Sequence, residues 1–304
     1  MKVQLLTLLF SIAVLVSVGQ TADDYHRMGT ELLYSGDFEG AQLAFDQAIA
    51  LDPTHVNAYI DLATVKHAIN DLAGAVAELN KALKLAPQAA VAHGNKGVIL
   101  EKQGLHQDAL NALNKAIELD TLDPEVLLSR GYVKSKLADN EGALADFNTS
   151  IRLNNQNARA YYLRGLLWAK LNKYQNAIQD FTKAIELAPR SPMAYADRAV
   201  ALEKVDRFED ALADFDKALQ LDPNNYRNYR NRGIAKEKAG LMNEAMQDYS
   251  KAIALNPQFA MAYFDRGVAH YRKGDKVAGC KDMSTAAELG FEPAKLSMED
   301  LCDQ

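Results

Sequence analysis

The sequence predicts an all-α fold built as a stacked array of helical hairpins, and three observations support this prediction. Small residues recur every 34 positions along almost the whole chain, each unit carries two apolar stripes with helical spacing, and the residues between the stripes suit helix ends. One row of small residues is Gly29, Ala63, Gly97, Gly131, Gly165, Ala199, Gly233 and Gly267, and another is Ala41, Ala75, Ala109, Ala143, Ala177, Ala211, Ala245 and Gly279. A constant period of this length is typical of a repeat array rather than of a globule with one core.

The unit from residue 158 to residue 191 shows how each hairpin arises. Tyr161, Gly165 and Trp168 lie on one face of a predicted first helix, because they are spaced at i, i+4 and i+7. A second apolar stripe, which includes Phe181, follows after a short polar interruption. The small residue at the Gly165 row lets the two helices of a hairpin approach closely, and an aromatic or large aliphatic residue at the Phe181 row fills the remaining space.

The turn between the two helices also repeats. It carries residues that suit a left-handed helix terminus, namely Gly36, Asn70, Gly104, Asn172, Asp206, Gly240 and Gly274. Ala138 interrupts this row, and we expect either strain or a longer turn there. The period then gives eight repeats over residues 22–293 and a C-terminal capping helix and tail over residues 294–304. The repeats are 22–55, 56–89, 90–123, 124–157, 158–191, 192–225, 226–259 and 260–293.

The order Tyr/Leu, Gly/Ala, Ala, Phe, Ala, Pro at this spacing resembles the tetratricopeptide repeat (TPR) family. This resemblance implies a right-handed α-solenoid superhelix in which the first helix of each repeat lines a concave inner face. The ending also resembles exported bacterial arrays of this type, in which an extra helix covers the open end, as solenoids require.

The first 19 residues differ from the repeats and have the layout of a secretory signal peptide. Lys2 precedes an uncharged apolar run from Leu5 to Val18, and small residues follow at a cleavage site. We predict cleavage after Gly19, because the run is short for a membrane span, which needs about 20 residues. The alternative is an uncleaved anchor, and we expect membrane association only in that case. The chain is thus predicted to be exported, either to the periplasm or cell envelope or as a secreted protein.

The sequence contains two cysteines, Cys280 and Cys302, and an even count in an exported chain permits a disulfide. We expect the second helix of the last repeat to run from about Lys276 to Glu288 and a final helix from about Glu292 to Leu301, with Gly290 between them. An antiparallel pair of helices would place both thiols near the same end, so we predict a structural disulfide. The alternative is a pair of buried free thiols.

Two charged rows appear together in the last five repeats. One is Arg130, Arg164, Arg198, Arg232 and Arg266, and the other is Asp146, Asp180, Asp214, Asp248 and Asp282. Because both rows are absent from the first three repeats, we predict that they contact one another as partly buried ion pairs. Duplication of one repeat would give the same pattern without contact, and an arginine row that binds an acidic ligand is a third interpretation.

The first helices supply the candidate binding residues. We predict a groove that binds a peptide with apolar anchors and a negative group, because several of its residues are apolar without being needed within a hairpin. The candidate partner-binding residues are Leu128, Tyr132, Tyr162, Leu166, Val200, Arg227, Arg230 and Phe264. The alternative is that the apolar members of this set are buried by ordinary packing between repeats.

Composition and motif content exclude other classes of function. The net charge of −6 argues against general nucleic-acid binding, which favours a basic surface. The histidines have no metal-ligand spacing and no Gly-rich phosphate loop occurs, so we predict no metal, cofactor, catalytic residue or small-molecule substrate. The predicted function is a non-catalytic scaffold or adaptor for protein or peptide partners. The alternatives are a structural, self-assembling envelope component and an accessory subunit of a separate enzyme.

Overall fold

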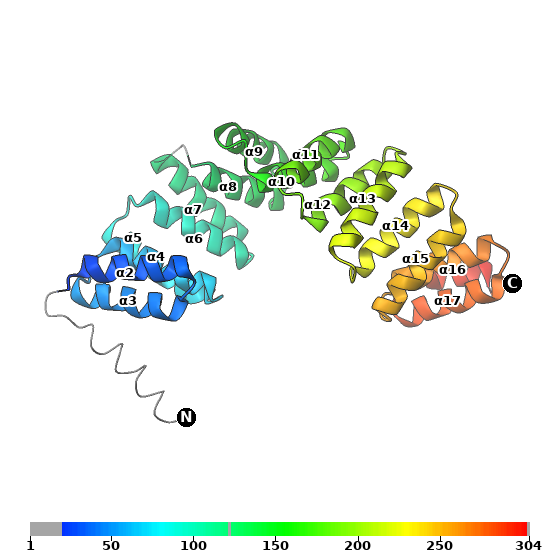
Figure 1. Cartoon of the computed structure of the whole chain (residues 1–304), viewed down its shortest axis with the longest axis horizontal. Helices are drawn as coiled ribbons and strands as arrows, with labels where there is room; N and C mark the ends of the chain where they lie inside the picture. The colour runs from blue at the N-terminus through cyan, green and yellow to red at the C-terminus, as the bar shows by residue number, and fades with distance from the viewer. Residues whose placement is uncertain (1–19, 121–122, 303–304) are drawn as a thin grey trace, which may run out of the picture. The chain divides into compact units, whose positions relative to one another are not determined.

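The structure, a computed structural model, describes residues 20–120 and 123–302, and every regular element within these ranges is a helix (Figure 1). The predicted signal peptide at residues 1–19 lies outside the described residues. The described helices form eight consecutive pairs followed by one terminal helix, which confirms the predicted α-solenoid class. None of these helices has the length and apolarity needed to cross a bilayer.

The chain divides after Leu153 into two compact units, each of which is described by itself. The first unit contains the pairs α2 (Ala22–Ser35) and α3 (Phe38–Leu51), α4 (Val56–Ala68) and α5 (Leu72–Leu85), α6 (Ala90–Lys102) and α7 (His106–Leu119), and α8 (Pro124–Lys136) and α9 (Asn140–Leu153). The second unit contains α10 (Ala158–Lys170) and α11 (Tyr174–Leu187), α12 (Pro192–Glu203) and α13 (Phe208–Leu221), α14 (Tyr226–Lys238) and α15 (Met242–Leu255), α16 (Ala260–Arg272) and α17 (Lys276–Glu288), and finally α18 (Glu292–Leu301). Each first helix begins at the first residue of a 34-residue unit.

Local sequence determines where these helices begin. The Asn157 side chain accepts a hydrogen bond from the backbone N–H of Ala160 at the start of α10, and the Ser191 hydroxyl accepts one from Ala194 at the start of α12. Pro192 occupies the first turn of α12, where a helix has no need of its N–H. These caps satisfy N–H groups that have no partner within the helix.

The residues of the turn row adopt the left-handed conformation that their composition indicates, and one of them, Ala138, is strained. Asn172 and Gly240 adopt positive φ angles of 58° and 82°, so each reverses the chain in the left-handed region. Ala138 does the same with a φ of 64°, although its Cβ makes this conformation unfavourable by about 1 kcal/mol. The turn is no longer than its counterpart at Asn172, because three residues separate the helices in both cases. The structure thus supports the expectation of strain and not that of a longer turn.

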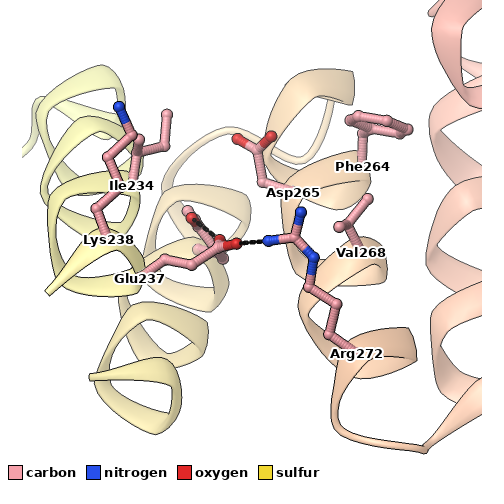
Figure 2. A pocket seen from close by; sticks show the side chains of 8 residues that line it. Ile234, Glu237, Lys238, Phe264, Asp265, Val268 and Arg272 are labelled. Carbon is pink, nitrogen blue, oxygen red and sulfur yellow. Dashed lines mark hydrogen bonds and ion pairs between the residues drawn. The ribbon is translucent and has the colours of Figure 1, made fainter. Parts of the chain in front are cut away.

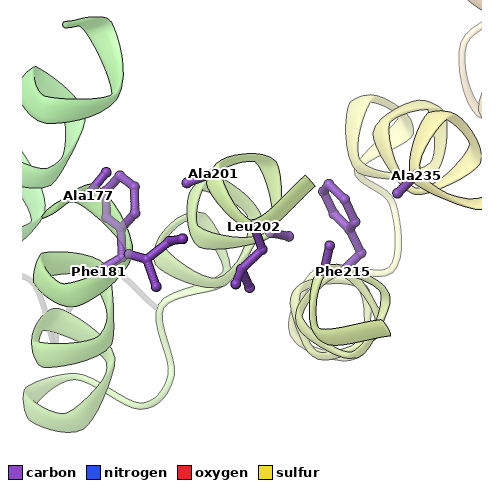
Figure 3. Close-up of a cluster of buried hydrophobic side chains, with 9 residues drawn as sticks. Ala177, Phe181, Ala201, Leu202, Phe215 and Ala235 are labelled. Atoms are coloured by element: carbon purple, nitrogen blue, oxygen red, sulfur yellow. The ribbon is translucent and has the colours of Figure 1, made fainter. Parts of the chain in front are cut away.

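Close packing within a hairpin depends on the small residues. A Cβ placed on Gly165 of α10 would lie 2.8 Å from Cε1 of Phe181, which is closer than carbon atoms pack. The ring of Phe181 therefore lies directly against the α10 backbone and is fully buried. In the second unit the core continues from repeat to repeat, because Phe181, Leu202 and Phe215 belong to one buried cluster that extends from α11 to α14 (Figure 3).

The two charged rows contact one another, as predicted. Nε and a terminal nitrogen of Arg198 donate to the two carboxylate oxygens of Asp214, both at 2.7 Å, which joins α12 to α13 within one repeat. The other terminal nitrogen donates to Thr182 of the preceding repeat at 3.0 Å. The Asp214 side chain is only 9% exposed, so the pair is mostly removed from water. The equivalent pairs are Arg130–Asp146, Arg164–Asp180, Arg232–Asp248 and Arg266–Asp282.

The C-terminal end of the second unit is covered and covalently joined. The short helix α18 packs against α17 through the fully buried Ala294. Cys280 of α17 forms a disulfide with Cys302 at the end of α18, which confirms the predicted pairing. In the chain-entropy treatment, closing a loop of this size stabilises the fold by about 3 kcal/mol.

Candidate functional site

The first helices form the inner side of the second unit. Consecutive first helices approach one another, as α10 does with α12 and α12 with α14, whereas consecutive second helices of this unit do not do so to the same extent. A stack that is tighter on one side curves toward that side. We call the surface of α10, α12, α14 and α16 that faces this side the inner face of the second unit.

A pocket of about 380 Å³ opens on the inner face between α14 and α16. Its lining from α14 consists of Ile234, Glu237 and Lys238. Its lining from α16 consists of Phe264, Asp265, Val268 and Arg272. Figure 2 shows these side chains converging from the two helices. The site therefore joins apolar surface to several charged groups, which is the usual composition of a ligand pocket.

Tyr249 of α15 forms the floor of the pocket. Its ring lies against α14, where a Cβ on Gly233 would approach Cε1 of Tyr249 to 2.5 Å. The residue is fully buried, and its hydroxyl donates to Oε2 of Glu237 at 3.0 Å. Burial raises the pKa of Tyr249 above its ordinary value of 10, so the hydroxyl remains a donor at physiological pH. Glu237 is thus held in place from below.

Two ion pairs connect α14 to α16 at the pocket. The cation belongs to α16 in the first pair and to α14 in the second. Arg272 of α16 donates to Glu237 of α14, as the dashed line in Figure 2 shows. Arg230 of α14 donates from Nε to Oδ2 of Asp265 on α16 at 2.5 Å. Burial raises the pKa of the Asp265 carboxyl, and the Arg230 charge and hydrogen bond oppose that rise. The pocket walls are therefore fixed by charges that neutralise one another pairwise.

The same kind of contact recurs elsewhere between consecutive first helices. The hydroxyl of Tyr162 on α10 donates to Asp197 of α12 at 2.7 Å, from the position in its repeat that Arg230 occupies in α14. Lys238 of α14 donates to Glu203 of α12, just as Arg272 does to Glu237 one repeat later. These contacts are 35 residues apart in the sequence in every case. They set the register of one first helix against the next.

The predicted groove residues have several different environments. Leu128 is fully buried, so its assignment to an exposed patch is wrong, because a side chain without accessible surface cannot contact a partner. Tyr132 is half-buried beneath Lys136, whose Nζ lies 4.9 Å from the ring centroid. Both residues belong to the first unit, whereas the other candidates belong to the second.

Within the second unit the remaining candidates divide into packing residues and pocket residues. Tyr162, Leu166 and Val200 are half-buried and pack against the core cluster, as the packing alternative proposes. Arg227 is exposed and its guanidinium lies 5.1 Å from the Tyr226 ring centroid. Phe264 lines the pocket and contacts Phe291 with ring centroids 5.2 Å apart, and Arg230 lies next to the lining through its ion pair with Asp265.

Sequence reasoning missed most of the pocket. Among the pocket residues that we did not select, Glu237, Tyr249 and Arg272 provide its polar centre. Tyr249 carries a visible signal, because it is the one member of the Phe181 row with a hydroxyl group. Acidic residues at 203 and 237, each followed 35 residues later by a cation, are a second signal. Among residues 20–120 and 123–302, no cluster of His, Cys, Asp and Glu has the grouping that a metal ion requires.

Sequence profiles of one family match most of the array. Profiles described as "Tetratricopeptide repeat" match residues 32–94, 90–121, 158–191 and 192–225, and one described as "TPR repeat" matches residues 238–274. The chain is 37% identical over 99 residues to tetratricopeptide repeat protein 36 of Xenopus tropicalis, an alignment that covers 31% of this chain. The chain spans about half of that relative, namely 47%.

Solved structures with the same fold are also similar. A tetratricopeptide repeat protein from Parabacteroides merdae superposes with a TM-score of 0.60 at 25% identity, covering 80% of this chain and 97% of that one. YrrB, described as a TPR protein with an unusual peptide-binding site, gives 0.51 at 25% identity over 61% of this chain and 95% of its own. PilF of Pseudomonas aeruginosa gives 0.60 at 22% identity over 66% and 92%, which is a likeness of fold alone.

Proposed function

The chain belongs to the tetratricopeptide repeat family, and from this premise we propose that it is a non-catalytic adaptor that binds a segment of a partner protein on the inner face of the second unit. Proteins with this fold mediate protein–protein interactions, and YrrB is described as having a peptide-binding site. The observation that carries the proposal is the pocket between α14 and α16, where apolar Ile234 and Val268 lie beside fixed charges. This combination suits a side chain of a bound segment, which needs apolar contact and polar orientation.

We also propose that the chain is exported. The Cys280–Cys302 disulfide supports this, because such bonds persist in oxidising compartments and are rare in the cytosol.

Site-specific photo-crosslinking tests the binding site directly. A photoreactive residue in place of Ile234 should form adducts with a partner, and the same residue in place of the exposed Gln220 on α13 should not. Equal yields from the two positions would contradict inner-face binding.

A double variant measures the contribution of the pocket. Ile234→Ala combined with Val268→Ala removes apolar contact area at the pocket and should weaken partner binding at least about tenfold. The melting temperature separates this effect from loss of folding. If the variant lost self-association in sedimentation while it retained partner binding, the self-assembling alternative would replace the adaptor.

A further inference from the structure

The first helices of the second unit expose charge of one sign only. The charged residues of the first helices that are exposed are all cations, counting Lys204 immediately after α12. They are Arg159, Lys170, Lys204, Arg227, Lys238 and Arg272. The second helices expose both signs, with the carboxylates Glu186, Glu209, Asp210, Asp216, Glu244 and Glu288 and the cations Lys251, Lys276 and Lys281. A surface that exposes cations alone stands out in a chain whose net charge is −6.

The carboxylates of the first helices offset this positive charge only in part. Four are present, at Asp197, Glu203, Glu237 and Asp265, and none of them is exposed. Asp197 accepts a hydrogen bond from Tyr162, and Asp265 accepts one from Arg230. The other two contact exposed cations, because Glu203 pairs with Lys204 and Lys238, and Glu237 pairs with Arg272. In these three pairs the cation is 43%, 45% and 60% exposed and the carboxylate only 8%, 8% and 18%, so an approaching ligand meets the cations first.

An apolar row runs beside the cations. Leu166, Val200, Ile234 and Val268 each precede a cation, respectively Lys170, Lys204, Lys238 and Arg272, by four residues. Residues four apart lie on the same face of a helix, and the pocket shows this directly, because Ile234 and Lys238 line it together with Val268 and Arg272. The four apolar residues are half-buried, so part of each side chain is accessible.

We propose that the inner face of the second unit selects partner segments that combine acidic and apolar side chains. This inference rests on the proposed function and names the class of its partner. Carboxylates of the segment would lie on the cation row, and its apolar side chains would lie on the adjacent apolar row and in the pocket. The charge complementarity favours an acidic segment, because a basic one would meet like charges along the whole row. Nucleic acid offers phosphates but no aliphatic side chains for the apolar row.

Selection from a display library of random 15-residue peptides tests this choice. The chain should enrich peptides that are rich in Asp, Glu and aliphatic residues, with binding that weakens as salt rises. Enrichment of basic or uncharged peptides would overturn the acidic preference and leave the proposed function intact. If the wild type and the Ile234→Ala, Val268→Ala variant enriched peptides equally, the proposed function itself would fail.

Two triple variants that remove the same charge from different helices test the proposal quantitatively. Lys204→Gln, Lys238→Gln and Arg272→Gln together should weaken binding of an enriched acidic peptide about tenfold or more, since each exposed cation contributes modestly. The control is Lys183→Gln, Lys217→Gln and Lys251→Gln, which removes the same charge from α11, α13 and α15. Circular dichroism establishes that both variants fold. Equal weakening in the two variants, or equally tight binding of a single-stranded oligonucleotide, would overturn the proposal.

Discussion

The two units share one hairpin design but differ in the charge that their first helices expose. In the first unit these helices expose both signs, with Asp23, Glu31 and Glu125 as well as Arg27, Lys102 and Lys136. In the second unit the exposed charges of the first helices are cations alone. The buried positions of the two units remain equivalent, as Phe147 and Phe181 show, each fully buried against a glycine. The buried positions therefore repeat from unit to unit because packing requires them, whereas the exposed positions carry different charges in different repeats.

The Arg–Asp ion pairs, which we call the ion-pair ladder, also differ between the units, because they are more numerous in the second unit. The second unit has an Arg–Asp pair in each of its four repeats, whereas Lys96 occupies the arginine position in the third repeat of the first unit. Lys96 donates to Asn80 at 2.8 Å in an exposed setting.

The largest expected effect comes from a substitution that removes one ion pair of this ladder. Arg198→Ala should lower the free energy of unfolding by about 3 kcal/mol, because it leaves the buried carboxylate of Asp214 without its partner. Lys96→Ala, at the equivalent position of the first unit, should cost less than about 1 kcal/mol. Urea denaturation measures both values, and peptide affinity should not change in Arg198→Ala. Similar costs for the two variants would show that the ladder makes no difference between the units.

A smaller effect tests the turns. Ala138→Gly in the first unit should stabilise by about 1 kcal/mol, because glycine adopts positive φ without a Cβ clash. Gly240→Ala in the second unit should destabilise by a similar amount. Nothing lies within 4 Å of a Cβ built on Gly240, so only the backbone conformation is changed. Thermal denaturation should move the two melting temperatures in opposite directions, and a shift in the same direction would contradict the strain at Ala138.

The smallest effect concerns pH. Burial raises the pKa of the Asp197 carboxyl above its ordinary value of 3.8, so the folded state holds this proton to higher pH than the unfolded state does. This carboxyl therefore makes the wild type lose stability as pH rises from about 3.8 through the raised value. Asp197→Asn does not titrate, so it should be more stable than the wild type above this window and gain nothing below it.

A first-unit variant is the control for that measurement. Asp61→Asn removes a contact of 2.8 Å with His26 at the equivalent position, and it should not stabilise the protein at neutral pH. Melting temperatures at pH 3 and pH 7 compare the two variants. A gain for Asp197→Asn that is the same at both pH values would contradict the titration of Asp197 as its source.

The sequence predicts the fold closely because the fold depends on periodic, local requirements. Gly165 and Phe181 must be small and large at fixed places for the helices to pack, so their rows are visible along the chain. Arg198 and Asp214 were predicted to touch because their rows change together, and Cys280 and Cys302 because a hairpin brings them to one end.

The site was less predictable because exposure depends on what packs above each residue. Leu128 and Tyr162 occupy equivalent places, yet Leu128 is fully buried and Tyr162 reaches a carboxylate on the next helix. The pocket arises from a contact between repeats at Glu237 and Arg272. Arg272 belongs to a row of cations, but the position of Glu237 is acidic in only three of the eight repeats. The acidic half of the contact therefore gives no continuous row to follow, and the structure is needed to bring the two residues together.

The disulfide also changes the connectivity of the C-terminal end. Cys280 and Cys302 close the intervening chain into a covalent ring that contains Gly290 and the whole of α18. A protease that cuts once inside this ring opens a loop but releases no fragment, because the two sulfurs still hold both pieces. A cut outside the ring separates the chain at once. The end of the second unit therefore tolerates one broken peptide bond in oxidising conditions and loses that tolerance when it is reduced.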